Sequence, residues 1–261
     1  MTQPVSARLS PRWPLRAASV AIALLAWELI ARTGIVPRPL FPPPSVVAAA
    51  FVGWARSGTL LLDLGASLWH ALLGYLIGAA CGVIVGTISG RSVWVNAAIG
   101  PILQVLRPVP PVAIIPLVIL WLGIGHAAKI GSTAYAVFLP VWVATHTGTS
   151  TVPQLYLWGA RTLGTSRVRE LAEVVLPAAL TNIAAGLRVG ISVAFVMVFV
   201  TELSGASSGL GYEIAASQAA YRVDRMMAAL ALLSAAGALA DYLQSLALHR
   251  LCPWLRLMES A

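Results

Sequence analysis

The chain has 261 residues, of which 59% are hydrophobic and 10% are charged, and its formal net charge at pH 7 is +8. Soluble domains carry about 25% charged residues and disordered chains are polar and charged, so the composition excludes both classes and indicates a polytopic membrane protein. The 17 lysines and arginines stand singly between apolar runs. Nucleic-acid binding needs clustered positive charge, and we therefore expect no nucleic-acid partner.

Six apolar stretches are long enough, or nearly so, to cross a bilayer, for which about 20 residues are needed. These stretches are 17–31, 66–90, 101–122, 130–147, 183–203 and 226–248. The first is followed by Arg32 and a proline-rich segment instead of a small-residue cleavage site, so we expect an uncleaved helix and not a signal peptide. With the N-terminus inside, eleven cations lie at or near the cytoplasm and six lie outside. The sequence therefore predicts an all-α membrane protein of six transmembrane helices with both termini cytoplasmic.

Glycines recur at every fourth position of the second stretch. They are Gly74, Gly78, Gly82, Gly86 and Gly90. This spacing places them on one helix face, where a neighbouring backbone can approach very closely. Two interpretations stay open: tight helix packing within one subunit, or an interface or sliding surface between subunits.

The third stretch is broken by prolines. Five of them lie between positions 101 and 116, so regular helix is not expected before Pro111. Irregular backbone at membrane depth is tolerated only where protein or a water-filled cavity surrounds it. Arg107 lies in this segment. Three roles are open to it: contact with an anionic substrate, support of an interface, or pairing with a carboxylate.

The connection 149–178 is the longest one on the predicted cytoplasmic side. Tyr156, Ala160 and Leu163 recur in it at helical spacing, which predicts a short helix with one apolar face. Gly164 is a natural stop for this helix.

A second short helix is expected in the same connection. Ser166 is placed to cap a helix over 167–175, and Pro177 is expected to separate that helix from the next membrane span. An exposed helix–glycine–helix element of this length is suited to binding a partner. The alternative is a mere linker.

Two acids within the membrane are candidates for function, because ionisable groups are costly there. Asp241 and Gln244 belong to a polar stripe of the last stretch, which should face protein or water instead of lipid. Glu202 ends the fifth stretch on the outer side. Each acid could form a structural ion pair, for which Arg188 or Arg250 is available to Asp241, or could serve a proton-coupled carrier.

The chain shows no catalytic motif. HExxH, GxSxG and paired histidine–cysteine sets are absent, and the two cysteines, Cys81 and Cys252, lack metal-site spacing. A Walker A loop needs a lysine before Ser or Thr, but the only lysine, Lys129, is followed by Ile130. We therefore expect no catalytic residue, no metal site and no ATP hydrolysis by this chain.

The segment 157–177, LWGARTLGTSRVRELAEVVLP, resembles the EAA loop of ABC-importer permeases, in which EAA, three residues, Gly, nine residues and I-x-LP follow one another. Gly164 stands at the glycine, and Leu176 and Pro177 stand at the closing pair. Trp158 and Gly159 replace the usual Glu and first Ala.

Longer segments resemble the nitrate/sulfonate/taurine permease group of ABC importers. These segments are LFPPPSVVAA at 40–49, PILQVLRPVPPVAIIPLVILWLGIGHAAKI at 101–130, LPAALTNIAAGLRVGISVAF at 176–195 and TELSGASSGLGY at 201–212. The resemblance implies a single permease domain, 1–261, with the type I importer fold, in the bacterial inner membrane. Its implied partners are a dimer of cytosolic ABC ATPases that bind ATP and Mg, a second permease copy in a homodimer, and a periplasmic substrate-binding protein. No cofactor is expected in this chain itself.

The resemblance also implies roles for residues. The connection 149–178 becomes the coupling loop, and its ATPase-coupling residues are Trp158, Gly159, Ala160, Arg161, Thr162, Leu163, Gly164, Leu176 and Pro177. Candidates for the translocation path are Arg107, Asn182, Ser192, Glu202 and Asp241. The first choice of cargo is taurine or another aliphatic sulfonate. Nitrate or bicarbonate and a small aromatic or pyrimidine compound are alternatives, and an ion-coupled secondary carrier is a further alternative.

Overall fold

The structure, a computed structural model, describes residues 13–37 and 39–252. Helices account for all of the regular secondary structure in these ranges. The elements are α1 (Trp13–Thr33), α2 (Pro44–Arg56), α3 (Thr59–Arg91), α4 (Val93–Leu106), the 3-10 turn η1 (Pro111–Ile114), α5 (Ile115–Leu122), α6 (His126–Ser150), α7 (Gln154–Thr162), α8 (Arg167–Glu170), the π-helical turn η2 (Leu171–Val175), α9 (Leu176–Leu203), α10 (Leu210–Ala219) and α11 (Val223–Leu251).

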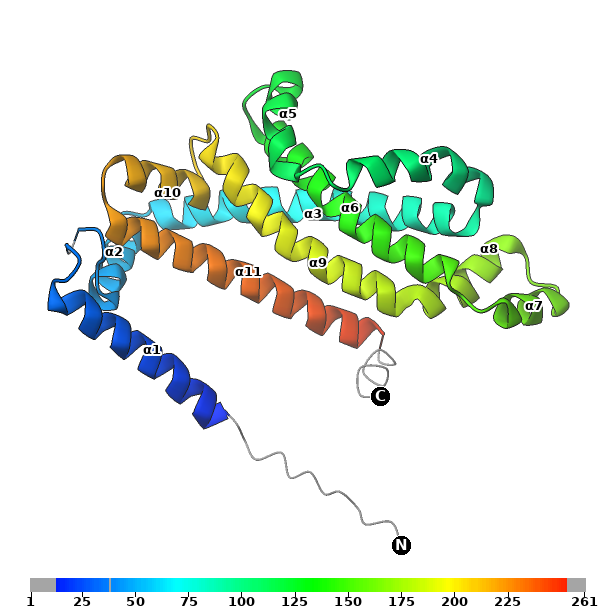
Figure 1. Ribbon diagram of the computed structural model, residues 1–261, viewed down its shortest axis with the longest axis horizontal. Helices are drawn as coiled ribbons and strands as arrows, with labels where there is room; N and C mark the ends of the chain where they lie inside the picture. Colours follow the sequence, from blue (N-terminus) through cyan, green and yellow to red (C-terminus); the bar gives the residue numbers. More distant parts are fainter. Residues whose placement is uncertain (1–12, 38, 253–261) are drawn as a thin grey trace, which may run out of the picture.

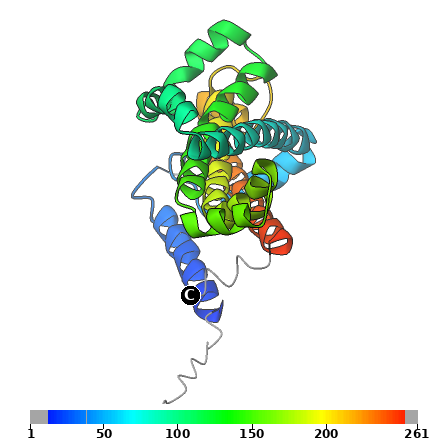
Figure 2. The ribbon, with the colours of Figure 1, turned by 90° about the vertical axis from the view of Figure 1, so that its right-hand side faces the viewer.

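The long helices α3, α6, α9 and α11 run along the long axis of the molecule (Figure 1). The helix α6 packs against both α3 and α9, and α9 also packs against α11. At one end of this bundle lie α2 and α10, and at the other end lie α7 and α8 (Figure 1); we call these the α10 end and the α7 end. Figure 2 shows α1 and α5 leaving the bundle on opposite sides.

The glycines of α3 face α6 along the whole contact. A Cβ built on Gly82 would lie 2.8 Å from Val141 Cβ, and one on Gly86 would lie 2.6 Å from Thr145 Cβ. Gly74, Gly78 and Gly90 are equally crowded by atoms of α6. The face of α3 that carries the glycines is therefore covered by a helix of the same subunit.

The region before Pro111 differs from the expectation that regular helix does not begin there. The helix α4 runs over Val93–Leu106 with Pro101 inside it, and the hydroxyl of Ser92 caps its start by accepting the Val95 N–H at 3.3 Å. The chain then turns by 93° before Pro111–Leu122. Helical backbone hydrogen bonding is interrupted only between Leu106 and Pro111, where successive prolines lack the N–H donor. The third predicted span is thus a bent pair of helices.

Membrane-crossing helices can be counted only in the part of the chain that the structure describes. Four helices there are long and apolar enough to cross a membrane, and the count rises to five if the bent pair is a single span. The helix α1 is not among them, and it contains Arg16, Glu28 and Arg32. The predicted number of six is therefore not confirmed. The predicted positions of the two termini concern residues 1–12 and 253–261, which lie outside the described residues.

Pro177 does not separate the second loop helix from the next span. Residues Arg167–Leu203 form one continuous helix, in which the Leu176 N–H bonds to the Leu171 carbonyl, five residues back. Proline cannot donate the usual bond, and its ring would clash in a regular helix. The wider π turn accommodates it without a break, so the predicted boundary is wrong.

Candidate functional site

The α7 end carries a short amphipathic helix. Inside α7, Leu157 is fully buried and Ala160 is nearly so, and Leu157 packs in a small cluster with Val152 and Val175. Of the apolar face predicted for this helix, only Ala160 points inward, because Tyr156 and Leu163 are exposed. The buried stripe is rotated by about one position relative to the prediction.

The outer surface of the α7 end carries exposed apolar side chains beside the exposed Arg161, Arg167 and Arg169, and the described chain does not cover it. Its exposed large hydrophobic side chains are Leu155, Tyr156, Trp158, Leu163 and Val168; we call this set the α7 patch. Contiguous exposed apolar surface marks an interaction site. The α7 patch therefore indicates a surface that another protein covers.

The two helices of this end are joined rigidly. Gly164 has φ of +74°, and the Thr165 N–H bonds to the Ala160 carbonyl at 3.2 Å across it, which is the glycine stop of an α-helix. Ser166 then caps α8 by accepting the Arg169 N–H. Both predicted signals act as expected.

An ion pair fastens α7 to α8. Arg161 donates from Nε to Glu170 Oε2 at 2.9 Å and from Nη2 to Glu170 Oε1 at 3.2 Å. The hydrogen bond to Glu170, and then its charge, raise the pKa of Arg161 above its usual value. Arg91, the last residue of α3, lies 3.7 Å from the same carboxylate. Glu170 thus connects the α7 patch to the membrane-spanning helices.

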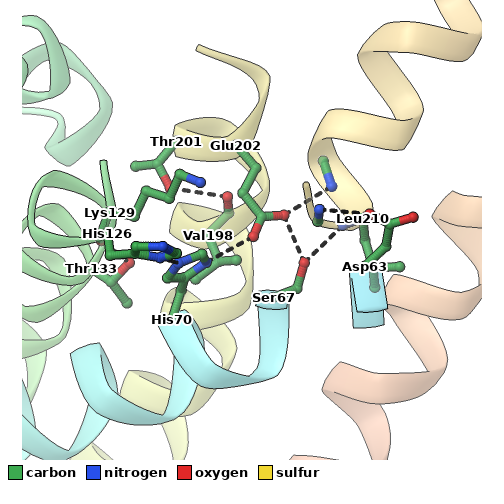
Figure 3. Close-up of polar contacts among 12 residues, drawn as sticks. Asp63, Ser67, His70, His126, Lys129, Thr133, Val198, Thr201, Glu202 and Leu210 are labelled. Atoms are coloured by element: carbon green, nitrogen blue, oxygen red, sulfur yellow. Dashed lines mark hydrogen bonds and ion pairs between the residues drawn. The ribbon is translucent and has the colours of Figure 1, made fainter. Parts of the chain in front are cut away.

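At the opposite end, Glu202 is the centre of a buried polar network (Figure 3). Its side chain is fully buried. Glu202 Oε2 accepts the hydroxyl of Ser67 at 2.7 Å and the N–H of Gly211 at 3.0 Å, and Oε1 lies 3.1 Å from Nδ1 of the buried His70. His70 Nε2 in turn lies 2.7 Å from His126 Nδ1. Helices α3, α9 and α10 therefore meet on one carboxylate, and α6 is connected to it through His70.

This network holds the first turn of α10. The N–H groups of Gly209, Leu210 and Gly211 bond to Asp63, Ser67 and Glu202, respectively. These are donors that a helix leaves without partners in its own backbone. A carboxylate near them is also favoured by the helix dipole. Glu202 was predicted as a residue of the translocation path, and the structure places it in the polar network that holds the first turn of α10.

A hollow face runs across the side of the bundle between α4 and α11. Three cavities lie on it, of about 660, 430 and 530 Å³. The first and second share Ala185 and Val189 of α9, and the second and third share Arg107 and Val143. They therefore form one continuous surface, which we call the hollow face.

Most of the predicted path residues lie on or beside the hollow face. Asp241 and Ser192 line its first cavity, where Arg188 Nε lies 3.4 Å from Asp241 Oδ1. The ion-pair interpretation of Asp241 thus agrees with the structure. Arg107 lies between the second and third cavities. Asn182 instead packs with its Cβ against the backbone of Gly148 in α6.

Several polar residues of these sites were missed from the sequence. Asp63, Ser67 and His70 follow one another at spacings of four and three in the otherwise apolar α3. Polar residues on one stripe of an apolar helix signal a face turned toward protein. That spacing was the available signal for the network around Glu202.

Known sequences and structures resemble this chain over most of its length. A family profile described as "Binding-protein-dependent transport system inner membrane component" matches residues 78–251. The putative aliphatic sulfonates transport permease protein SsuC of Bacillus subtilis is 33% identical over 90% of this chain and 85% of its own length. The taurine transport system permease protein TauC of Escherichia coli is 32% identical over 95% of this chain and 94% of its own length.

Solved structures share the fold. The MetNI methionine ABC transporter in an inward-facing conformation contains a chain that matches with a TM-score of 0.59, 19% identity and coverage of 78% of this chain and 97% of that chain. A crystal structure of an amino acid ABC transporter with histidines matches with a TM-score of 0.57 and 19% identity, over 77% of this chain and 98% of that chain. At this identity the likeness shows the fold.

Proposed function

Because the chain belongs to the inner membrane components of binding-protein-dependent transport systems, we propose that it forms half of a translocation path for a small sulfonate anion. Membership makes it a multi-pass ABC importer permease of the inner membrane that works with an ATPase and a binding protein. The permease is not itself an enzyme, and ATP is hydrolysed by the separate ATPase subunit.

The observation that carries the proposed path is the hollow face. It extends from α4 to α11 and presents the cation Arg107, together with the Arg188–Asp241 ion pair, beside apolar walls. Positive charge in a cleft with low-dielectric walls attracts anions. Relatives named as taurine and aliphatic sulfonate permeases match nearly the whole chain, which supports a sulfonate as the anion.

A second copy of the chain completes the path in this proposal. The hollow face is open on one side, and the arm formed by α4 and α5 exposes large apolar residues, among them Trp94, Val105, Leu120 and Trp121. A symmetric pair is the commonest arrangement of identical subunits. Two such faces turned toward each other would enclose a channel, and the arms would gain a partner surface.

The α7 patch is the proposed docking surface for the ATPase. It combines exposed Trp158 and Leu163 with a rigid connection to α9 through α8 and η2, so a displacement of the patch is transmitted to the hollow face. In this proposal the α7 end faces the cytoplasm, and the partner ATPase binds ATP and Mg. The α10 end then faces the binding protein.

The substrate class is tested by uptake into proteoliposomes that contain the permease, its partner ATPase and its binding protein. We expect ATP-dependent uptake of labelled taurine, with competition by ethanesulfonate and little competition by nitrate or benzoate. Inhibition by nitrate or benzoate at lower concentrations than by either sulfonate would contradict the sulfonate proposal and favour the corresponding alternative cargo.

A further inference from the structure

The third cavity of the hollow face is a cleft between α4 and α6, of about 530 Å³. The polar residues that line it are Asn96 and Gln104 of α4, Arg107 at its end, and Trp142, His146 and Thr147 of α6. None of the described lining residues is acidic. The cleft is therefore a cavity with one fixed positive charge, amide and imidazole groups, and no competing carboxylate.

Arg107 differs from most arginines of the described chain. Seven of those arginines lie within 4.0 Å of a carboxylate, but Arg107 forms no ion pair with any acid that the structure describes. A guanidinium offers five N–H donors in a planar fork, which fits an anion with several oxygens better than the point charge of a lysine does. Arg107 is thus available to an anion that enters the cleft.

The aromatic wall of the cleft is held in place from behind. The buried Ser89 of α3 accepts the indole N–H of Trp142 at 3.2 Å and lies 3.0 Å from His146 Nδ1. Its hydroxyl also lies 3.2 Å from the Gly86 carbonyl. One small side chain therefore orients both rings from the side opposite the cleft.

This arrangement decides what His146 offers to the cleft. Which ring nitrogen of a histidine carries hydrogen is set by the bond that the other nitrogen makes. When the Ser89 hydroxyl donates to His146 Nδ1, the proton of the neutral ring is on Nε2. When the hydroxyl instead donates to the Gly86 carbonyl, Nδ1 donates to Ser89 and Nε2 of the neutral ring has no hydrogen. Only the first state offers an N–H to the cleft, so an anion bound at Nε2 selects it.

We propose that this cleft is the oxyanion-binding subsite of the translocation path, in which Arg107 and His146 hold the sulfonate head of the cargo and Asn96 and Gln104 add amide donors. Ser89 is a positioning residue. The inference rests on the proposed function and deepens it. Because no lining carboxylate is present to bind an ammonium group, the subsite recognises the sulfonate and is indifferent to the amine of taurine.

The test uses the complete importer in proteoliposomes and compares taurine with ethanesulfonate, which lacks the amine. Arg107→Gln is expected to raise the half-saturating concentration, measured with loaded binding protein, at least tenfold and by the same factor for both compounds, because a charge-assisted hydrogen bond is lost. Arg107→Lys keeps the charge but not the planar fork of donors, so its half-saturating concentration should lie between those of wild type and Arg107→Gln. Arg250→Gln at the exposed end of α11 is the matched control and should match wild type.

A second variant leaves the charge of the cleft intact. Ser89→Ala is expected to raise the half-saturating concentration about threefold for both sulfonates, because it frees the two rings without touching Arg107. Direct titration of taurine into the detergent-solubilised permease–ATPase complex gives the same comparison without uptake. If Arg107→Gln assembles poorly, the Ser89→Ala result alone decides.

Two outcomes separate the subsite from the function on which it rests. If the wild-type importer takes up sulfonates and neither Arg107→Gln nor Ser89→Ala changes the half-saturating concentration, the subsite is overturned. The proposed function then still stands. A loss for taurine but not for ethanesulfonate also overturns it, because the amine would then be recognised. If the wild-type importer takes up neither sulfonate, the proposed function itself fails.

Discussion

Glu202 shows at the scale of a single residue how a buried charge is stabilised inside a membrane protein. One oxygen of its carboxylate accepts hydrogen bonds from the Ser67 hydroxyl and the Gly211 N–H, and the other oxygen faces the His70 ring. A buried charge is tolerated when all of its lone pairs have partners. Gly209 and Gly211 are required nearby, because a Cβ on either would collide with Glu202.

Removal of this carboxylate should destabilise the protein strongly. Glu202→Ala leaves Ser67, His70 and Gly211 without their acceptor, and the expected cost is about 3–5 kcal/mol. Glu202→Gln keeps one oxygen for Ser67 and Gly211, so its cost should be about 1–3 kcal/mol. Thermal unfolding of the detergent-solubilised protein measures both. Glu173→Ala, at an exposed position, is the control, and equal midpoints for the Ala and Gln variants would contradict this role of Glu202.

Partners close in sequence or obvious in charge could be predicted, whereas partners from distant helices could not. Arg188 was available as a partner of Asp241 from the sequence, and the two side chains do pair. The partners of Glu202 lie 135 residues away at Ser67 and 132 residues away at His70. Only the packing of α3 against α9 brings them together, and no local pattern encodes that contact.

At the scale of elements, the contact between α3 and α6 depends on the missing side chains of α3. A methyl group at Gly82 would lie 2.8 Å from Val141 Cβ and 3.0 Å from the Phe138 carbonyl. The neighbouring helix must then move, and overpacking of this kind costs about 1–3 kcal/mol. We therefore expect Gly82→Ala to lower the midpoint of thermal unfolding.

The same helix supplies the control for this prediction. Gly65 also lies in α3, but a Cβ there meets nothing within 4 Å. Gly65→Ala should raise the midpoint slightly, because alanine favours helix over glycine by about 1 kcal/mol. Shifts of the same sign for both variants would show that the close approach to α6 is not what makes Gly82 necessary.

The α7 patch is positioned by one left-handed residue. Gly164 has open space around its Cβ position but a φ of +74°, so Gly164→Val is disfavoured by backbone conformation and not by a clash. We expect this variant to insert in the membrane and to retain its thermal midpoint to within a few degrees, but to co-purify with markedly less ATPase. Gly53→Ala, inside α2 and also uncrowded, should bind the ATPase normally.

Binding of the ATPase at the wild-type level by Gly164→Val would count against the α7 patch as the docking surface. Equal loss of ATPase in the Gly164 and Gly53 variants would indicate a general defect of the protein. The measurement is the ratio of ATPase to permease after affinity purification from membranes, compared at equal expression.

The elements themselves could be predicted where a cap or stop acts locally. Ser166 and Gly164 delimit α8 and α7 as expected. Pro177 and Pro101 were misleading, because a π turn accommodates the first and a helix contains the second. The register of α7 was wrong by about one position, since which side of a short helix is buried depends on Val152 and Val175 beneath it.

At the scale of the whole molecule, the hollow face is a property of the assembly of helices. Its lining comes from α4, α6, α9 and α11, so the sequence predicted Arg107 and Asp241 as separate candidates without showing that one surface joins them. The family could be recognised from collinear segments, and the matching proteins agree. The cleft beside Arg107 could not be predicted from the sequence, because its walls come from two separate helices, α4 and α6.

The central claim is that this permease imports a sulfonate by coupling to a separate ATPase, and ATP-driven uptake of labelled taurine tests it most directly. Proteoliposomes are prepared with the permease alone and with the permease, ATPase and binding protein, each with and without internal ATP and with ion gradients collapsed by ionophores. We predict uptake only in the complete system with ATP, unaffected by ionophores. Uptake by the permease alone, driven by an ion gradient and insensitive to ATP, would contradict the claim and identify a secondary carrier.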